Sequence, residues 1–196
     1  MSYEEVMNLK TPDDLWKYMH DNIKYGWTNK NGEFREYNDS RQNEEYYIHS
    51  PKETVERKSG ICSDQVLLEK DWFDHHNIEN HIISLEYKDD NSRRVGNGHV
   101  FLIYVLNNKY YYFENAFREC ANIIEFNTLN ELIGTTIGAY LVATNNTEKI
   151  NNMCLTIDGH LTIGNDNNKH YEETINDKDV IKDYINDIKE GINKFI

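Results

Sequence analysis

Three residues that together can form a nucleophilic thiol site occur in order along the chain: Cys62, His99 and Glu114. A thiol attacks a carbonyl carbon when it is ionised, when an imidazole moves its proton and when a third polar group orients that imidazole. Cys62 falls in the first turn of a predicted helix, where free N–H groups and the helix dipole favour a thiolate. The backbone N–H of Cys62 is also a natural donor to a developing oxyanion. A lone cysteine is more often structural, so the case depends on His99 and its neighbour.

His99 opens the most apolar stretch of the chain, residues 99–106, which is predicted to be a strand buried on both faces. A polar ring in such a place is costly unless it is paired. An isolated histidine at a strand end usually turns to solvent, so the partner strand decides its role. Residues 110–117 are the predicted partner, and Asn107-Asn108 form a plausible tight turn because Asn tolerates positive φ.

The length of that turn determines which residue lies beside His99. With a two-residue turn, Glu114 lies on the same face as His99 and diagonally next to it. With a three-residue turn, Asn115 takes the place of Glu114. We favour the shorter turn because Lys109 is poorly suited to a left-handed position. Either side chain can accept from the imidazole, but a carboxylate would also stabilise the imidazolium.

Other candidate functional residues are few. Trp27 is a candidate for the second oxyanion donor through its indole N–H, although a core or rim aromatic is the commoner role. Cys120 and Cys154 have no catalytic neighbour in sequence and are interpreted as structural. The three cysteines lack the spacing of a zinc site or of a disulfide framework. We therefore expect reduced thiols, no metal and no cofactor.

The elements that must position these residues follow the order helices, antiparallel strands, helices, which is typical of an α+β domain. At 196 residues, one domain is the default. The polar segments 28–49 and 88–98 are predicted loops in which specificity would lie. The predicted elements are helices beginning at Pro12, Pro51 and Ser59 or Gly60, strands at 81–87, 99–106 and 110–117, a helix after Thr128, a hairpin over 154–163 and an amphipathic helix bearing Ile181, Ile185, Ile188 and Ile192.

Composition excludes some functions. With 21 Lys+Arg and 34 Asp+Glu the formal net charge is −13, which argues against broad binding to nucleic acid or to anionic membranes. The longest apolar run, Val100–Leu106, is far too short to span a bilayer. The acidic N-terminus lacks the pattern of a secretory signal. We therefore expect a cytoplasmic protein; oligomeric state is left open.

Several segments together resemble the transglutaminase-like superfamily. Residues 51–64 (PKETVERKSGICSD) resemble its nucleophile segment, in which a short helix leads through Gly-x-Cys into the helix that carries the active-site cysteine. Residues 99–104 are similar to its histidine strand, and Tyr112-Phe113-Glu114 is similar to the end of its next strand. Residues 22–25 resemble the close of its first helix. The family usually has Asp, often followed by Pro, where this chain has Glu114-Asn115.

The resemblance implies a papain-like core over about residues 11–117, with N-terminal helices packed on an antiparallel sheet and residues 118–196 as an elaboration of the same domain. It also implies a Cys62-His99-Glu114 triad that acts on a peptide or protein substrate through a thioacyl intermediate. Hydrolysis by a peptidase or amidase is favoured over crosslinking, because hydrolysis needs only water. The alternative is a binding module that kept the fold and lost turnover.

Overall fold

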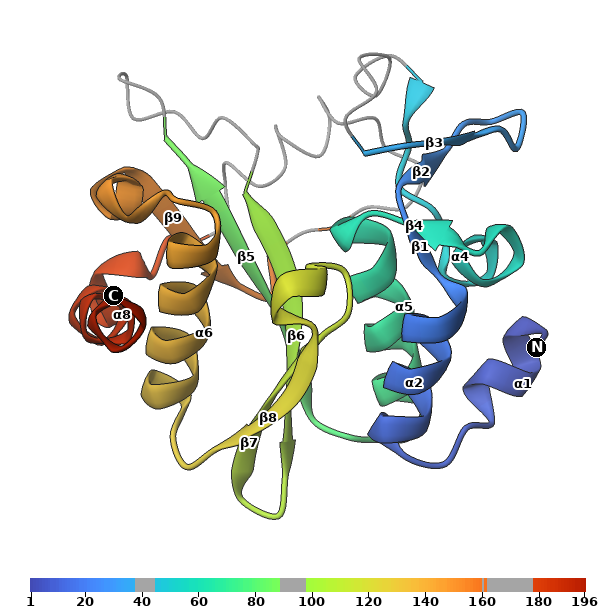
Figure 1. The fold of residues 1–196 in the computed structure, drawn as a ribbon. Coiled ribbons are helices and arrows are strands. Elements are labelled where there is room, and N and C mark those ends of the chain that lie inside the picture. The colour runs from blue at the N-terminus through green and yellow to red at the C-terminus, as the bar shows by residue number, and fades with distance from the viewer. Residues whose placement is uncertain (38–44, 89–97, 160, 162–177) are drawn as a thin grey trace.

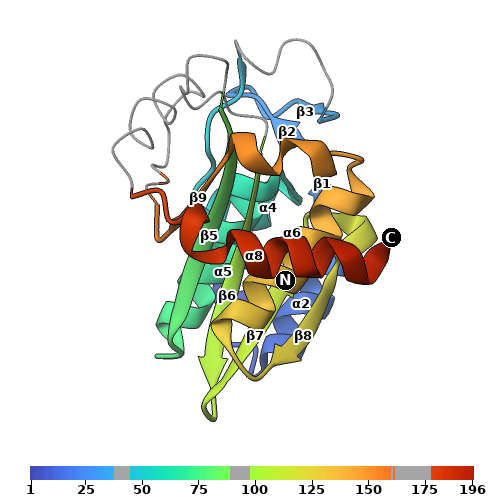
Figure 2. The same cartoon turned by 90° about the vertical axis from the view of Figure 1, so that its left-hand side faces the viewer.

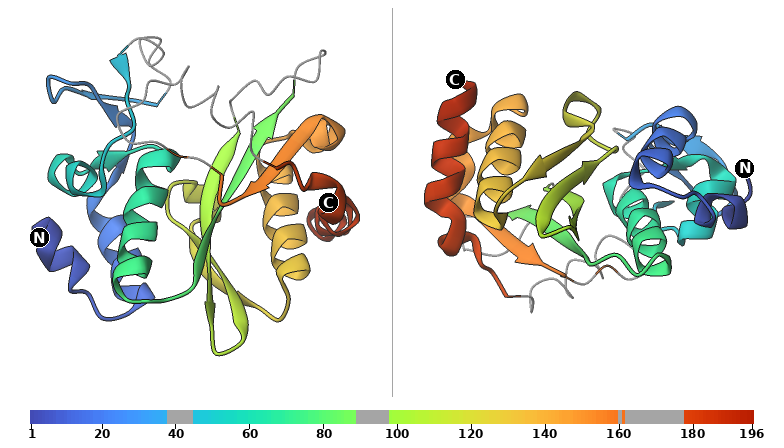
Figure 3. Two further views of the ribbon diagram at one scale, coloured as in Figure 1. Left: turned by 180° about the vertical axis from the view of Figure 1, so that it is seen from behind. Right: turned by 90° about the horizontal axis from the view of Figure 1, so that it is seen from below.

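The computed structural model describes residues 1–37, 45–88, 98–159, 161 and 178–196 of the chain, and shows a central sheet with helices on both faces (Figure 1). The view from below separates the layers: α8 and α6 lie on one side of the sheet, and α5, α2 and α1 on the other (Figure 3). The fold is therefore mixed helix and strand, as expected for an α+β protein.

Several helices begin where the sequence supplies a capping side chain. Thr11 and Ser50 each form a capping box with the residue three positions later, and a proline occupies the first helical position in both cases. Thr128 likewise caps the helix that follows it. The helices are α1 (Tyr3–Met7), α2 (Pro12–Asn22), α4 (Pro51–Arg57), α5 (Cys62–His75), α6 (Leu129–Ala143) and α8 (Ile181–Phe195), with short 3₁₀ turns at Arg118–Cys120 and Thr147–Asn152.

The central sheet has five strands in the order β8-β7-β6-β5-β9, and every neighbouring pair is antiparallel. Its strands are β5 (Asn80–Tyr87), β6 (His99–Leu106), β7 (Lys109–Glu114), β8 (Asn122–Phe126) and β9 (Met153–Ile157). The strands β5 and β6 are buried on both faces of the sheet, because α5 covers one face and α6 covers the other (Figure 2). β5 begins one residue before the strand predicted at 81–87, and β6 has the bounds predicted for it, 99–106.

Two separate cores hold these layers together. Trp72 and Phe73 of α5 pack with Leu102 and Phe113 on one face of the sheet. The other face carries the apolar stripes of α6 and α8. At about 25 cal/mol per Å² of apolar surface removed from water, such burial is the main force that holds helix to sheet. The isoleucine stripe of α8 thus serves as core: Ile181, Ile188 and Ile192 are buried.

Short strands tie down the chain before the helix α5. β1 (Lys24–Tyr25) pairs in parallel with β4 (Ser59–Gly60), so that Tyr25 lies opposite Gly60. β2 (Trp27–Thr28) pairs with β3 (Phe34–Arg35) as a small hairpin. The predicted loop 28–49 therefore contains regular structure at its start, and its residues 38–44 lie outside the described part of the chain, as does most of the second half of the predicted hairpin over 154–163.

Candidate active site

Cys62 is the first residue of α5, so its N–H is among the four that a helix leaves without an intrahelical partner. This helix start is held by Asp64, whose buried carboxylate accepts the backbone N–H of Ile61 at 2.9 Å, that of His49 at 2.8 Å and the hydroxyl of Tyr46 at 3.0 Å. Burial raises the pKa of Asp64 to about 6, although these hydrogen bonds and His49 oppose the rise. Asp64 therefore fixes the local backbone around the thiol.

His99 and Glu114 meet at the ends of β6 and β7. The imidazole Nε2 lies 2.5 Å from Oε2 of Glu114, and both side chains are buried. The other oxygen of Glu114 accepts the backbone N–H of Phe117 at 2.9 Å, which fixes the carboxylate. Interactions with Cys62 also raise the pKa of His99, so the thiol lies close to the ring. One imidazole thus lies between a thiol and a carboxylate.

This meeting depends on the hairpin register. Leu106 pairs with Lys109, and Asn107 and Asn108 have φ of 53° and 59°. That is the two-residue turn with both central residues in the left-handed region. The expected register is confirmed, and it places Glu114, not Asn115, beside His99.

The electrostatics of the site favour an imidazolium. Burial alone would lower the pKa of His99, but the charge of Glu114 and hydrogen bonds to Cys62 and Glu114 outweigh it and raise the pKa to about 10. An opposite charge and hydrogen bonds to the charged form are the usual causes of such a rise. The ring is therefore protonated at neutral pH in the resting site.

Asn115 has a supporting place. Its amide donates to Oε1 of Gln65 at 2.6 Å, and the Gln65 amide donates to the carbonyl of Gly60 at 2.8 Å. This buried chain of hydrogen bonds joins the end of β7 to the turn before Cys62. It positions the two strand-end residues relative to the start of α5.

Tyr25 is a site residue that sequence reasoning did not single out. Burial, followed by interaction with Cys62, raises the pKa of Tyr25 strongly, so its hydroxyl lies near the thiol and stays a phenol that can donate. Trp27, the residue expected as an oxyanion candidate, is fully buried against Tyr46, Ile48 and Ile61, and its indole N–H has no partner among the described residues. The one signal for Tyr25 was the resemblance of residues 22–25 to the end of a first helix.

A second unpredicted contact comes from α6. The ring of Tyr140 stacks on that of His99, with centroids 5.2 Å apart and planes 11° from parallel. Phe117 packs against both rings, at 5.8 Å from His99 and 5.4 Å from Tyr140. The two aromatic side chains shield the imidazole and restrict its rotation.

Glu69 is a buried acid next to this group. It lies two helical turns after Cys62, is 2% exposed, and its Oε2 has no hydrogen-bond partner among the described residues. Burial, and then the charge of Glu114, raises its pKa well above the usual value. Burial thus disfavours a second negative charge beside the pair of His99 and Glu114.

Comparison with known proteins identifies the family. A family model described as a transglutaminase-like domain matches residues 4–119, which is more than half of the chain. The chain therefore belongs to the transglutaminase-like family, as its motifs indicated. This family is usually cysteine-based and generally enzymatic, with thiol acyl transfer or hydrolysis as its chemistry. No curated protein matches the chain.

The described helices were also compared with the dimensions of a bilayer. None of them combines the length and the apolar character that a membrane crossing requires.

Proposed function

We propose that the protein is a cysteine-dependent hydrolase that cleaves an amide bond through a thioacyl intermediate, with Cys62, His99 and Glu114 as its triad. The observation that carries the proposal is the position of His99, which hydrogen-bonds to the Glu114 carboxylate and interacts with the nearby Cys62 thiol. A buried imidazolium next to a sulfur is the arrangement that nucleophilic thiol catalysis needs.

In the first step the Cys62 sulfur attacks the amide carbonyl carbon, and a new C–S bond forms. The negative charge that develops on the carbonyl oxygen is stabilised by the N–H of Cys62 and by the hydroxyl of Tyr25, which replaces Trp27 as the second donor. His99 then gives its proton to the leaving amine as the C–N bond breaks. The products of this step are a thioester on Cys62, a free amine and a neutral imidazole.

In the second step His99 takes a proton from water, which attacks the thioester carbon. The C–S bond breaks, the acid product leaves, and the thiolate–imidazolium pair returns. Water is favoured over a second amine as acceptor because hydrolysis requires no further binding site. Glu114 holds the ring orientation through both steps.

The fold supports a papain-like core, because the helix that carries the thiol packs against an antiparallel sheet that carries the imidazole and the carboxylate. We assign residues 11–117 to that core and 118–196 to an elaboration of the same domain, since α6 contributes Tyr140 to the site. The three cysteines are free thiols, which suits a reducing compartment, so we place the enzyme in the cytoplasm. A peptide or protein is the proposed substrate.

The test is pH-dependent alkylation of the thiol. Cys62 should react with iodoacetamide well below pH 8, and His99→Ala should remove that advantage. Equal reactivity of Cys62 in the folded and the denatured protein would refute the proposal. Cys120→Ser serves as the matched control, because Cys120 is half-buried and lies outside the triad.

A non-catalytic binding module is the second candidate. It is favoured by Tyr25, whose side chain lies near the thiol, and by Glu at a position where the family usually has Asp. The two candidates differ in one result. An enzyme accumulates a covalent acyl adduct of Cys62 when it is mixed with an activated ester, and releases the acid on standing, whereas a binding module forms no such adduct.

A further inference from the structure

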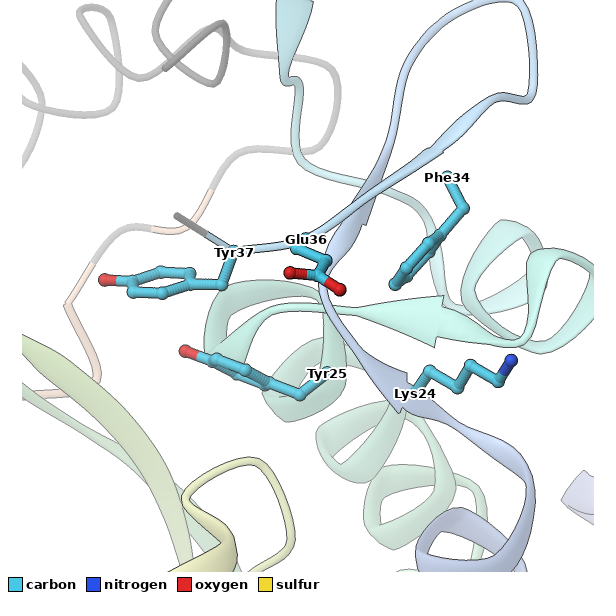
Figure 4. Close-up of a pocket in the computed structure, with 5 residues that line it drawn as sticks. All are labelled: Lys24, Tyr25, Phe34, Glu36 and Tyr37. Carbon is cyan, nitrogen blue, oxygen red and sulfur yellow. The ribbon is translucent and has the colours of Figure 1, made fainter. Parts of the chain in front are cut away.

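A pocket of about 540 Å³ lies beside the candidate nucleophile. It opens between the segment that follows α2 and the strand β3 (Figure 4). The residues that line it are Lys24, Tyr25, Phe34, Glu36 and Tyr37. None of them is in the proposed triad, and the reaction above uses only the hydroxyl of Tyr25.

Two contacts place this pocket at the thiol. Tyr25 forms part of its wall, and Cys62 is close enough to contribute to the raised pKa of Tyr25. The ring of Tyr37 lies 5.2 Å from that of Tyr25, and its pKa is raised by burial and then by the charge on Cys62. A side chain held between these rings would therefore belong to a residue close to the bond that is cleaved.

The lining has the chemistry of a cation site. Phe34 and Tyr37 are large aromatic side chains that remain 42% and 43% exposed. Exposed apolar side chains that gather around a polar group often mark a binding site. The carboxylate of Glu36 lies between them in Figure 4, and within the described residues it forms no ion pair. Aromatic faces and a carboxylate together attract a guanidinium or an ammonium group.

The remaining charges agree with this reading. Lys24 extends away from the two tyrosines in Figure 4, so Glu36 is the charged group that lies nearer to them. The net charge of −13 would also draw a cationic peptide towards the protein. A neutral apolar side chain would gain the aromatic contacts but would leave Glu36 unused.

We propose that this pocket binds the cationic side chain of a Lys or Arg residue next to the scissile amide. The inference rests on the proposed function, since it names the substrate class of that same site. It names Glu36 and Tyr37 as specificity determinants within the segment 28–49, where the sequence predicted that specificity would lie.

The test uses internally quenched octapeptides with Arg, citrulline, norleucine or Glu at each position flanking the scissile amide. The protein should prefer Arg over its neutral isostere citrulline, and Glu36→Gln should lower that ratio of kcat/KM about two- to fivefold, the range for one partly exposed charge pair. Tyr37→Leu should lower it by a similar factor. Raising the salt concentration should reduce the preference. Glu190→Gln, the same charge change on the exposed face of α8, is the matched control.

A second measurement separates this inference from the proposed activity. Binding of the Arg and citrulline peptides to Cys62→Ala is followed by calorimetry, which needs no turnover. A preference for Arg that Glu36→Gln abolishes supports the pocket even if the protein cleaves nothing. Equal binding of both peptides, or a preference for norleucine or Glu, overturns the pocket while leaving the thiol chemistry to its own test.

Discussion

At the scale of single residues, the site is an electrostatic arrangement around one imidazole. Glu114 and Cys62 both act on His99, and burial disfavours a further negative charge on Glu69. Burial by itself would favour a neutral ring. The protonation of His99 is thus a consequence of its partners, which makes it testable by removing one of them.

The change Glu114→Gln tests this balance. As pH rises, His99 loses its proton at a pKa of about 10, well above its ordinary value of 6.5, and the proton donor for the leaving group is lost. The alkaline limb of kcat/KM should therefore lie near pH 10 in the native protein and move to lower pH in Glu114→Gln. Because the folded pKa is raised, the pair stabilises the fold fully below pH 6.5, and this stabilisation disappears as pH rises through 10.

NMR titration of His99 provides the direct measurement of that pKa, and Glu119→Gln on the exposed turn after β7 is the control with the same charge change. A limb that stays in place in Glu114→Gln would show that the carboxylate is not the group that charges the ring.

At the scale of elements, the site is assembled from residues at or near the termini of four elements. The start of α5 supplies the thiol, the start of β6 the imidazole, the end of β7 the carboxylate, and α6 the stacked ring of Tyr140. Gly98 lets β6 begin in place, because a Cβ there would lie 1.6 Å from the carbonyl oxygen of Leu85. Helix and strand termini present groups that a regular element does not satisfy internally, which suits them for chemistry.

The contribution of α6 predicts the effect of substitutions at Tyr140. Tyr140→Leu removes the ring stacked on His99 and should lower kcat up to about tenfold, since an aromatic pair contributes about 0.5–1.5 kcal/mol beyond its buried area. The value of KM should change less. Tyr140→Phe keeps the stacked ring and should restore most of the activity. Steady-state kinetics of the two variants measure kcat and KM. An equal loss of kcat in both variants would show that the hydroxyl of Tyr140, and not its stacked ring, is what activity requires.

At the scale of the whole molecule, the sheet holds together two halves that each supply part of the site. α6 and α8 cross closely because glycines face each other: a Cβ on Gly191 would lie 1.9 Å from the carbonyl oxygen of Gly134, and one on Gly138 would lie 2.6 Å from Gly191. Gly134 and Gly138, which form a Gly-x-x-x-Gly pattern on α6, thus allow close packing of α6 against α8. The position of α6, and with it Tyr140, depends on that crossing.

Substitution at the crossing should therefore affect both stability and the site. Gly191→Ala should lower the free energy of unfolding by about 1–3 kcal/mol, because the helices must separate to admit a methyl group. It should also slow alkylation of Cys62, since Tyr140 would shift from His99. Urea denaturation and iodoacetamide kinetics check the two effects. Glu190→Ala, on the exposed side of the same helix, should change neither by a comparable amount.

Much of this architecture could be predicted from the sequence, because its signals are local. Caps at Thr11, Ser50 and Thr128 mark helix starts, and the alternating or continuous apolar runs mark β5 and β6. The pair Asn107-Asn108 predicts the two-residue turn, and that turn alone determines which face Glu114 occupies. The positions of Cys62, His99 and Glu114 within their elements were therefore open to prediction.

Other features required the tertiary structure, because they join residues that no local pattern links. Tyr25 reaches Cys62 through the pairing of two very short strands, and Tyr140 reaches His99 from a helix outside the matched family region. Trp27 and Tyr25 are equally plausible in sequence, and packing alone buries the first and turns the second to the thiol. Local sequence patterns predicted the places of Cys62 and His99 in their elements and the register between the strands that carry His99 and Glu114. The groups that surround them were decided by the long-range packing of helices on the sheet, which sets distances that spacing along the chain does not encode.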